Sequence, residues 1–159
     1  MIAIPIALLG NAANEISKEQ NEKYNAEFKV IDVETGLSQY KYTDTWTTPS
    51  FDSLNYVKAS DGNALMVYKI KATNLGTSTI SPYYGDFQLT DNTSGLIYQA
   101  QYESSSCTAL NTGYNSSSMT VAQNGSVTLY VIFDVPTGHS YSIGFSNYVY
   151  SFENWKWVE

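Results

Sequence analysis

The chain has 159 residues, of which 43% are hydrophobic, 14% aromatic and 14% charged, so it suits one domain with a substantial core, and intrinsic disorder is not expected. The net charge is −7 and the chain contains no arginine. A surface that tracks phosphates needs clustered lysine and arginine, so neither nucleic acid nor an anionic membrane surface is an expected partner.

Residues 1–10 form an apolar segment that is about half as long as a membrane-spanning helix. The large side chains follow the two-residue period of a strand, at Ile2, Ile4, Ile6 and Leu8. Three interpretations stay open: the remnant of a signal peptide or membrane anchor, a strand of the chain's own domain, or a strand donated to a neighbouring copy. A membrane is a partner only under the first interpretation.

A short polar helix is expected between residues 11 and 25. Asn14 is a suitable N-cap, and the apolar or long side chains that follow lie four residues apart, at Ile16, Gln20 and Tyr24. This stripe is too thin for a coiled coil. We therefore expect residues 1–25 to be an apolar strand or anchor remnant with a helical spacer, and residues 26–159 to be the folded domain.

From Ala26 the hydrophobic period changes to two, which predicts strands. The first expected strand contains Phe28 and Val30 and ends at a turn over residues 34–36. The next expected strands are marked by alternating large side chains, which are Tyr40, Tyr42 and Trp46 in the second and Met66, Tyr68 and Ile70 in the third.

The second half of the domain repeats this pattern. A hairpin is expected with Phe87 and Leu89 before its turn at residues 91–95 and Tyr98 after it, and residues 104–118 are expected to be a long polar loop. The clearest strand covers Val127–Val135, and a last strand carries Tyr141, Ile143 and Phe145. About seven short strands predict an all-β, immunoglobulin-like antiparallel sandwich.

Several of these segments follow one pattern in order, and they are residues 65–76, 86–91, 95–98, 123–127 and 133–136. The pattern resembles the telokin-like, immunoglobulin-fold domains of unknown function that occur on exported bacterial and archaeal proteins. The resemblance implies an immunoglobulin-like fold and a location outside the cytoplasm, and it supplies no catalytic residues. The polar stretch over residues 104–118 departs from the pattern, and no cysteine near residue 1 matches a lipid anchor.

Candidate chemistry is sparse in this sequence. His139 is the single histidine and follows a turn, where an exposed surface imidazole is expected, so no enzyme activity and no cofactor are predicted. One histidine and one cysteine cannot supply a zinc site. Asp86, Asp91 and Asn92, with Asp61, are considered as calcium ligands, but we favour hydrogen bonding within their own turns.

Cys107 is the single cysteine, so no disulfide forms within the chain. We expect it to be a partly buried free thiol in the loop, with a bridge to another chain as the alternative.

The C-terminal tail is rich in aromatic residues, which are Tyr148, Tyr150, Phe152, Trp155 and Trp157. A surface for self-association, packing within the domain and carbohydrate binding all fit such a tail, and we assign Trp155 and Trp157 to assembly. Three glycosylation sequons begin at Asn92, Asn115 and Asn124, all within expected loops. They fit an exported protein of a host that glycosylates, such as an archaeon.

These features predict a structural subunit of an extracellular filament or cell-surface layer. The subunit is expected to form homo-oligomers by inserting Ile2, Ile4, Ile6 and Leu8 into a neighbouring copy. The alternative is a membrane-anchored binding module outside the cytoplasm, with an envelope protein or a glycan as its partner.

Overall fold

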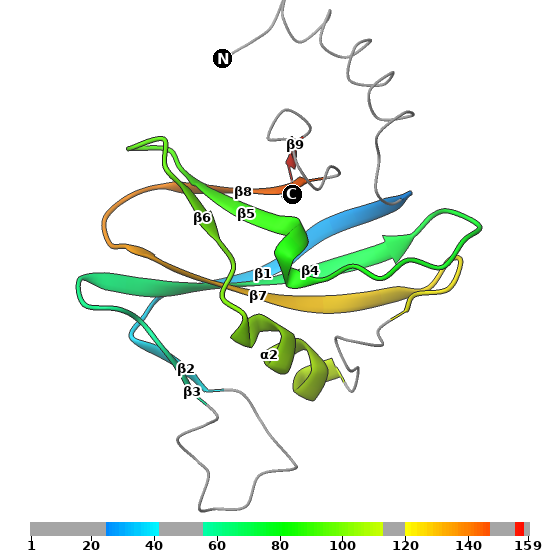
Figure 1. Ribbon diagram of the computed structural model, residues 1–159, viewed down its shortest axis with the longest axis horizontal. Helices are drawn as coiled ribbons and strands as arrows, with labels where there is room; N and C mark the ends of the chain where they lie inside the picture. The colour runs from blue at the N-terminus through cyan, green and yellow to red at the C-terminus, as the bar shows by residue number, and fades with distance from the viewer. Residues whose placement is uncertain (1–24, 42–55, 113–119, 147–154, 158–159) are drawn as a thin grey trace, which may run out of the picture.

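The computed structural model describes residues 25–41, 56–112, 120–146 and 155–157 (Figure 1). The predictions for the apolar segment and for nearly all of the helical spacer lie outside these residues. Within them the strands are β1 (Ala26–Leu37), β2 (Gln39–Lys41), β3 (Tyr56–Lys58), β4 (Asn63–Asn74), β5 (Phe87–Asp91), β6 (Ile97–Gln99), β7 (Ser126–Pro136), β8 (Tyr141–Ser146) and β9 (Trp155–Trp157). The helical elements are the 3-10 helix η2 (Tyr84–Asp86) and the α-helix α2 (Glu103–Thr112).

Two antiparallel sheets face each other across the domain (Figure 1). One has the strand order β1-β4-β7 and the other the order β6-β5-β8-β9, while β2 and β3 form a separate two-stranded ribbon. All of the strand pairs are antiparallel. The prediction of an all-β antiparallel sandwich is confirmed.

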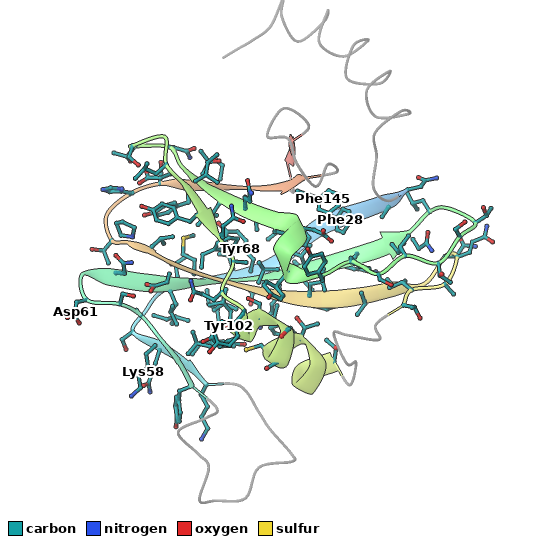
Figure 2. All side chains as sticks on the ribbon, in the orientation of Figure 1. Phe28, Lys58, Asp61, Tyr68, Tyr102 and Phe145 are labelled. Atoms are coloured by element: carbon teal, nitrogen blue, oxygen red, sulfur yellow. The ribbon has the colours of Figure 1, made fainter. Side chains whose placement is uncertain are left out.

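The main core lies between the two sheets. Leu129, Val131 and Phe133 alternate along β7 and are at most 1% exposed, as their two-residue period predicted. Phe28 of β1 joins the sheets, because its ring lies 4.1 Å from the Phe145 ring and 5.5 Å from the Phe87 ring, measured between centroids (Figure 2). Such aromatic contacts add to the stabilisation that area burial provides.

A second, smaller core lies on the outer face of the β1-β4-β7 sheet. It is built from Val57 of β3, Leu65 and Val67 of β4, Ile132 of β7 and Cys107 of α2. Figure 1 shows α2 and the β2–β3 ribbon on the side of β7 that is turned away from β5 and β8. This partial third layer explains why both faces of β7 are apolar around Ile132 and Phe133.

Three sequence predictions need correction. The expected loop over residues 104–118 begins as helix α2, which ends at Thr112. The first strand does not stop at residues 34–36, because a shift in register between Glu34 and Leu37 absorbs them within β1. The strand β8 is followed by β9, which extends the second sheet. The expected second strand survives as β2, and its continuation beyond Lys41 lies outside the described residues.

Candidate assembly site at the edge of strand β7

The β1-β4-β7 sheet has β1 and β7 at its edges, and the edge of a sheet presents backbone N–H and C=O groups that can bind another strand. Strand β1 is a poor template for such pairing. Its register shifts at Ile31 and again between Glu34 and Leu37, and Asp32 forms an ion pair of 3.3 Å with Lys69. Bulges and charges are the devices by which proteins protect edge strands.

Strand β7 has a regular edge. Its pairing with β4 runs without a register shift from the Thr73–Ser126 pair to the Asn63–Pro136 pair. Regular strands of this length are good templates for an added strand because their outward backbone groups recur at every second residue. The protection of this edge therefore depends on whatever covers it.

Helix α2 packs against β7 (Figure 1). Side-chain hydroxyl groups of the helix bond to the backbone at the edge of the strand. The N–H of Ile132 donates to Ser104 Oγ at 2.9 Å, and the N–H of Tyr130 donates to Thr108 Oγ1 at 2.9 Å. Thr108 Oγ1 in turn donates to the carbonyl oxygen of Tyr130 at 3.3 Å. Just before the helix, the N–H of Gln101 donates to the carbonyl oxygen of Ile132 at 2.7 Å.

The spacing of these groups explains why a helix fits a strand edge here. Residues four apart on an α-helix rise by about 6 Å, and outward groups two residues apart on a strand are separated by about 6.6 Å. Ser104 and Thr108 therefore match Ile132 and Tyr130. Both hydroxyl-bearing residues are buried, at 0% and 2% exposure, so the hydrogen bonds are shielded from water.

Cys107 lies on the same helix and points into the second core, where it is 0% exposed. The structure therefore corrects the prediction of a partly buried thiol in a loop. Burial, with a smaller contribution from the charge of Glu103, raises the pKa of the Cys107 thiol to about 12. The thiol is unreactive in this position because the thiolate is the nucleophilic form.

Ser104 and Thr108 are not recognisable as members of a site from the sequence pattern alone. Serine and threonine have low helix propensity, so a serine-rich stretch indicates a loop. The signal that was present is a stripe of hydroxyl-bearing residues four apart, at Ser104, Thr108 and Thr112. Such a stripe is polar, and a search for apolar helix faces does not detect it.

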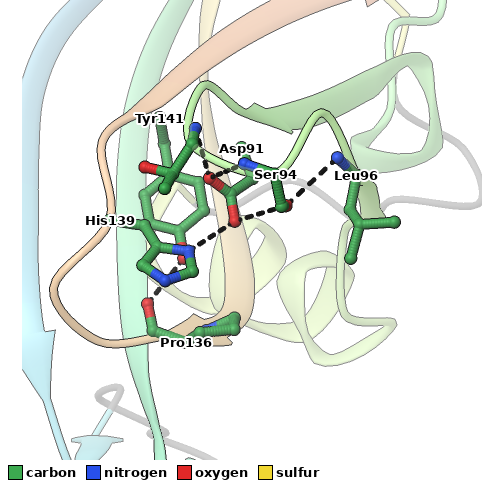
Figure 3. A network of polar contacts seen from close by, with 7 residues as sticks. Asp91, Ser94, Leu96, Pro136, His139 and Tyr141 are labelled. Atoms are coloured by element: carbon green, nitrogen blue, oxygen red, sulfur yellow. Dashed lines mark hydrogen bonds and ion pairs between the residues drawn. The ribbon is translucent and has the colours of Figure 1, made fainter.

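A second polar cluster joins the β5–β6 turn to the β7–β8 turn (Figure 3). The fully buried carboxylate of Asp91 accepts hydrogen bonds from His139 Nδ1 at 2.6 Å and from Ser94 Oγ at 2.8 Å. It also accepts the N–H groups of Thr93 and Ser94. Burial alone raises the pKa of Asp91, but these hydrogen bonds outweigh it and hold the pKa well below its usual range.

This geometry joins two turns and differs from that of a nucleophilic triad. In a nucleophilic triad the serine hydroxyl bonds to the imidazole, whereas Ser94 and His139 both bond to the carboxylate of Asp91. The Tyr141 hydroxyl donates to the carbonyl oxygen of Pro136 and closes the same corner (Figure 3). His139 is exposed at the surface, as expected after this turn, and its imidazole, which is 33% exposed, is anchored by the bond to Asp91.

Two of the three aspartates considered as calcium ligands are engaged in their own turns, as the favoured interpretation predicted. Asp91 bonds its own hairpin turn, and Asp86 Oδ2 accepts the N–H of Tyr83. Among the described residues there is no group of three or more histidine, cysteine, aspartate or glutamate side chains that could hold a metal ion.

The other predicted site residues are placed in part. Asn92 and Asn124 are exposed in turns, and Asn124 adopts a left-handed backbone conformation with φ of 63°. The backbone of β9 pairs Trp155 with Ser146 and Trp157 with Gly144. Asn115 and the four apolar residues of the N-terminal segment, Ile2, Ile4, Ile6 and Leu8, lie outside the described residues.

Within the part of the chain that the structure describes, the helices are all too short or too polar to span a membrane. No family model and none of the curated proteins match the sequence.

Solved structures share the fold. The yjhA protein from Bacillus subtilis superposes with a TM-score of 0.51 at 14% identity, over 82% of this chain and 83% of its own. The ycdA protein from Bacillus subtilis, provisionally named a lipoprotein, has a TM-score of 0.50 at 15% identity, over 82% of this chain and 34% of its own. An uncharacterized β-sandwich protein from Clostridium difficile has a TM-score of 0.49 at 13% identity, over 77% of this chain and 79% of its own. At these identities, the property that this chain shares with the two Bacillus subtilis proteins is the fold.

Proposed function

We propose that the chain is a structural subunit of an extracellular filament or cell-surface layer, and that residues 1–10 of one copy pair with a sheet edge of the next. The observation that carries this proposal is the edge of β7. Its outward backbone groups at Tyr130 and Ile132 bond to helix hydroxyls and to a single amide before the helix, and to no strand among the described residues. An edge of this kind is complementary to an extended donor.

The donor segment has the matching chemistry. Four large apolar residues recur at every second position of residues 1–10, and burying their side chains is worth about 6–12 kcal/mol before entropy costs. Backbone hydrogen bonds to the acceptor edge set the register. Each subunit then carries one donor and one acceptor, and this head-to-tail arrangement generates open filaments or layers.

A location outside the cytoplasm is part of the same proposal. The telokin-like, immunoglobulin-fold resemblance supports it, and so does the provisional lipoprotein name of ycdA from Bacillus subtilis. Asn92 and Asn124 are exposed in turns, where attached glycans would not disturb the core. A location outside the cytoplasm does not depend on how the copies join.

The test compares assembly of the wild-type chain with two variants, Ile4→Asp and Ile4→Val, by electron microscopy and light scattering. A charge at residue 4 cannot be buried against a partner, so Ile4→Asp is expected to stay monomeric. Ile4→Val keeps an apolar, β-branched side chain and is expected to assemble. Undiminished polymers of Ile4→Asp would rule out the donated strand.

A second candidate function, binding of an envelope glycan, has one observation in its favour. A groove of about 340 Å³ beside the start of β1 is lined by polar side chains, including Asn25, Thr77 and Thr79. Grooves of this size hold small ligands, and hydroxyl and amide groups suit sugar hydroxyls. Binding of surface polysaccharide that is lost in Thr77→Val and Thr79→Val would favour this function over assembly.

A further inference from the structure

We propose that helix α2 is a removable cap, and that residues 1–10 of a second copy pair with β7 at the place that residues 101–112 occupy here. This inference rests on the proposed function. It adds that β7 is the strand that accepts the donated segment, and that the segment displaces helix α2.

The contacts between α2 and the edge of β7 are of a kind that a strand can replace one for one. Ser104 and Thr108 satisfy the outward N–H groups of Ile132 and Tyr130 through hydroxyl oxygens, and Gln101 satisfies the Ile132 carbonyl through its own N–H. A paired strand offers backbone carbonyl and N–H groups at the same positions. The exchange leaves none of these buried groups without a partner.

The length and parity of the donor fit this edge. Residues 2–8 extend over about 23 Å as a strand, which matches the seven residues from Thr128 to Asp134 on β7. In an antiparallel ladder, alternate residues direct both backbone groups toward the partner. When Ile4 and Ile6 direct their backbone groups toward β7, Pro5 directs its own to the opposite side. The N–H that proline lacks is therefore not needed for pairing with β7.

The side chains fit as well. Around Ile132, the outer face of β7 belongs to the second core, which Cys107 of α2 helps to fill. Ser104 and Thr108 of the same helix contact β7 through their hydroxyl groups. Isoleucines that alternate along a donated strand can lie on the same face of the sheet as Ile132 and supply apolar surface beside it.

Cys107 provides a built-in reporter of the exchange. It is 0% exposed while α2 is docked, and burial raises its pKa to about 12, so alkylation is slow. Departure of α2 from β7 exposes the thiol to solvent. No other cysteine in the chain competes for the reagent.

The experiment uses the full-length Ile4→Asp chain, which keeps the acceptor and lacks a working donor. A fluorescent synthetic peptide of residues 1–12 is added, its binding is followed by anisotropy, and alkylation of Cys107 by N-ethylmaleimide is timed by mass spectrometry. We expect the peptide to bind and to accelerate alkylation by about tenfold or more. A peptide with Ile4→Asp is expected to leave the rate unchanged. The double variant Ser104→Ala, Thr108→Val, made in the Ile4→Asp chain, is expected to raise the rate without peptide.

Two outcomes overturn the cap while leaving assembly intact. In the first, the peptide binds and the alkylation rate of Cys107 stays at its basal value. In the second, the wild-type chain polymerises but the peptide does not bind to the Ile4→Asp chain. Failure of the wild-type chain to polymerise, with no binding of the peptide, would contradict both the proposed function and the cap.

Discussion

Asp91 shows how one buried carboxylate holds two turns together. Its oxygens accept hydrogen bonds from Thr93 and Ser94 in its own turn and from His139 in the turn between β7 and β8. The residue lies at the end of the hairpin strand that the sequence pattern predicted. Its partner His139 lies 48 positions further along the chain. This pairing was not predictable, because sequence spacing carries no information about which turns meet.

Replacement of His139 tests this link. His139→Ala removes the donor to the buried carboxylate and is expected to lower the melting temperature, because charged groups are costly to leave unpaired. His139→Asn places a side-chain N–H near the position of Nδ1 and is expected to recover part of the loss. Thermal unfolding followed by circular dichroism measures both. Equal melting temperatures for the wild type and His139→Ala would show that the link contributes nothing.

Acid conditions give a second residue-scale prediction. Hydrogen bonding holds the pKa of Asp91 below its usual value of about 3.9, so ionised Asp91 stabilises the fold fully above that value, and the contribution is lost as the pH falls toward the folded-state pKa. The difference in unfolding free energy between the wild type and Asp91→Asn is therefore expected to shrink below about pH 4. Urea titrations at about pH 6 and about pH 3 measure it. A difference that grows in acid would contradict the assignment.

At the scale of elements, α2 and β7 meet through two hydroxyl groups. Ser104→Ala and Thr108→Val each leave a buried N–H of β7 without its acceptor, which costs about 1–3 kcal/mol. The exposed Ser106 on the same helix offers the matched control, Ser106→Ala. Hydrogen exchange of the Tyr130 and Ile132 amides reports the effect at the contact itself. Protection that is unchanged in both variants would show that these bonds do not hold the helix.

Neighbouring residues of β7 serve the two cores, and this gives another test. Phe133 lies in the core between the sheets and Ile132 in the core beneath α2, and both are 0% exposed. Phe133→Ala is expected to destabilise the domain by about 3–5 kcal/mol and Ile132→Ala by about 2–5 kcal/mol. Under native conditions only Ile132→Ala is expected to speed alkylation of Cys107 strongly. Equal acceleration by both variants would mean that the two cores open together.

The strands of the sandwich were predictable because one face of each is buried. Phe87 and Leu89 in β5, like Leu129 and Val131 in β7, alternate with more exposed residues, and that period is a direct trace of the fold. No comparable hydrophobic period marks helix α2 in the sequence. It is anchored by Ser104 and Thr108, residue types that are common in loops, and by one buried thiol.

The second core was missed for a related reason. Ile132 lies between Val131 and Phe133, so the apolar run in β7 hid the fact that its two faces meet different partners. A continuous run of this kind indicates a strand that is buried on both faces. The alternation of apolar residues in β7 predicts only one buried face. The continuity of the apolar run through Ile132 indicates the second.

Seen as a whole molecule, the domain is a two-sheet sandwich with a partial third layer over one sheet (Figure 1). This layer covers the outer face and the edge of β7, while β1 at the opposite edge is interrupted by bulges. The two edges are therefore protected in different ways. The bulges of β1 are built into its backbone, whereas the cover of β7 is a separate element, which we propose to be removable.

The central claim is that residues 1–10 of one copy lie against β7 of another. It is tested most directly by disulfide trapping in a Cys107→Ser background. We predict that Leu8→Cys combined with Thr128→Cys on β7 gives a ladder of linked subunits on a non-reducing gel after mild oxidation, whereas Leu8→Cys combined with Lys29→Cys on β1 does not. A ladder with Lys29→Cys, or linkage confined within single chains, would contradict the account.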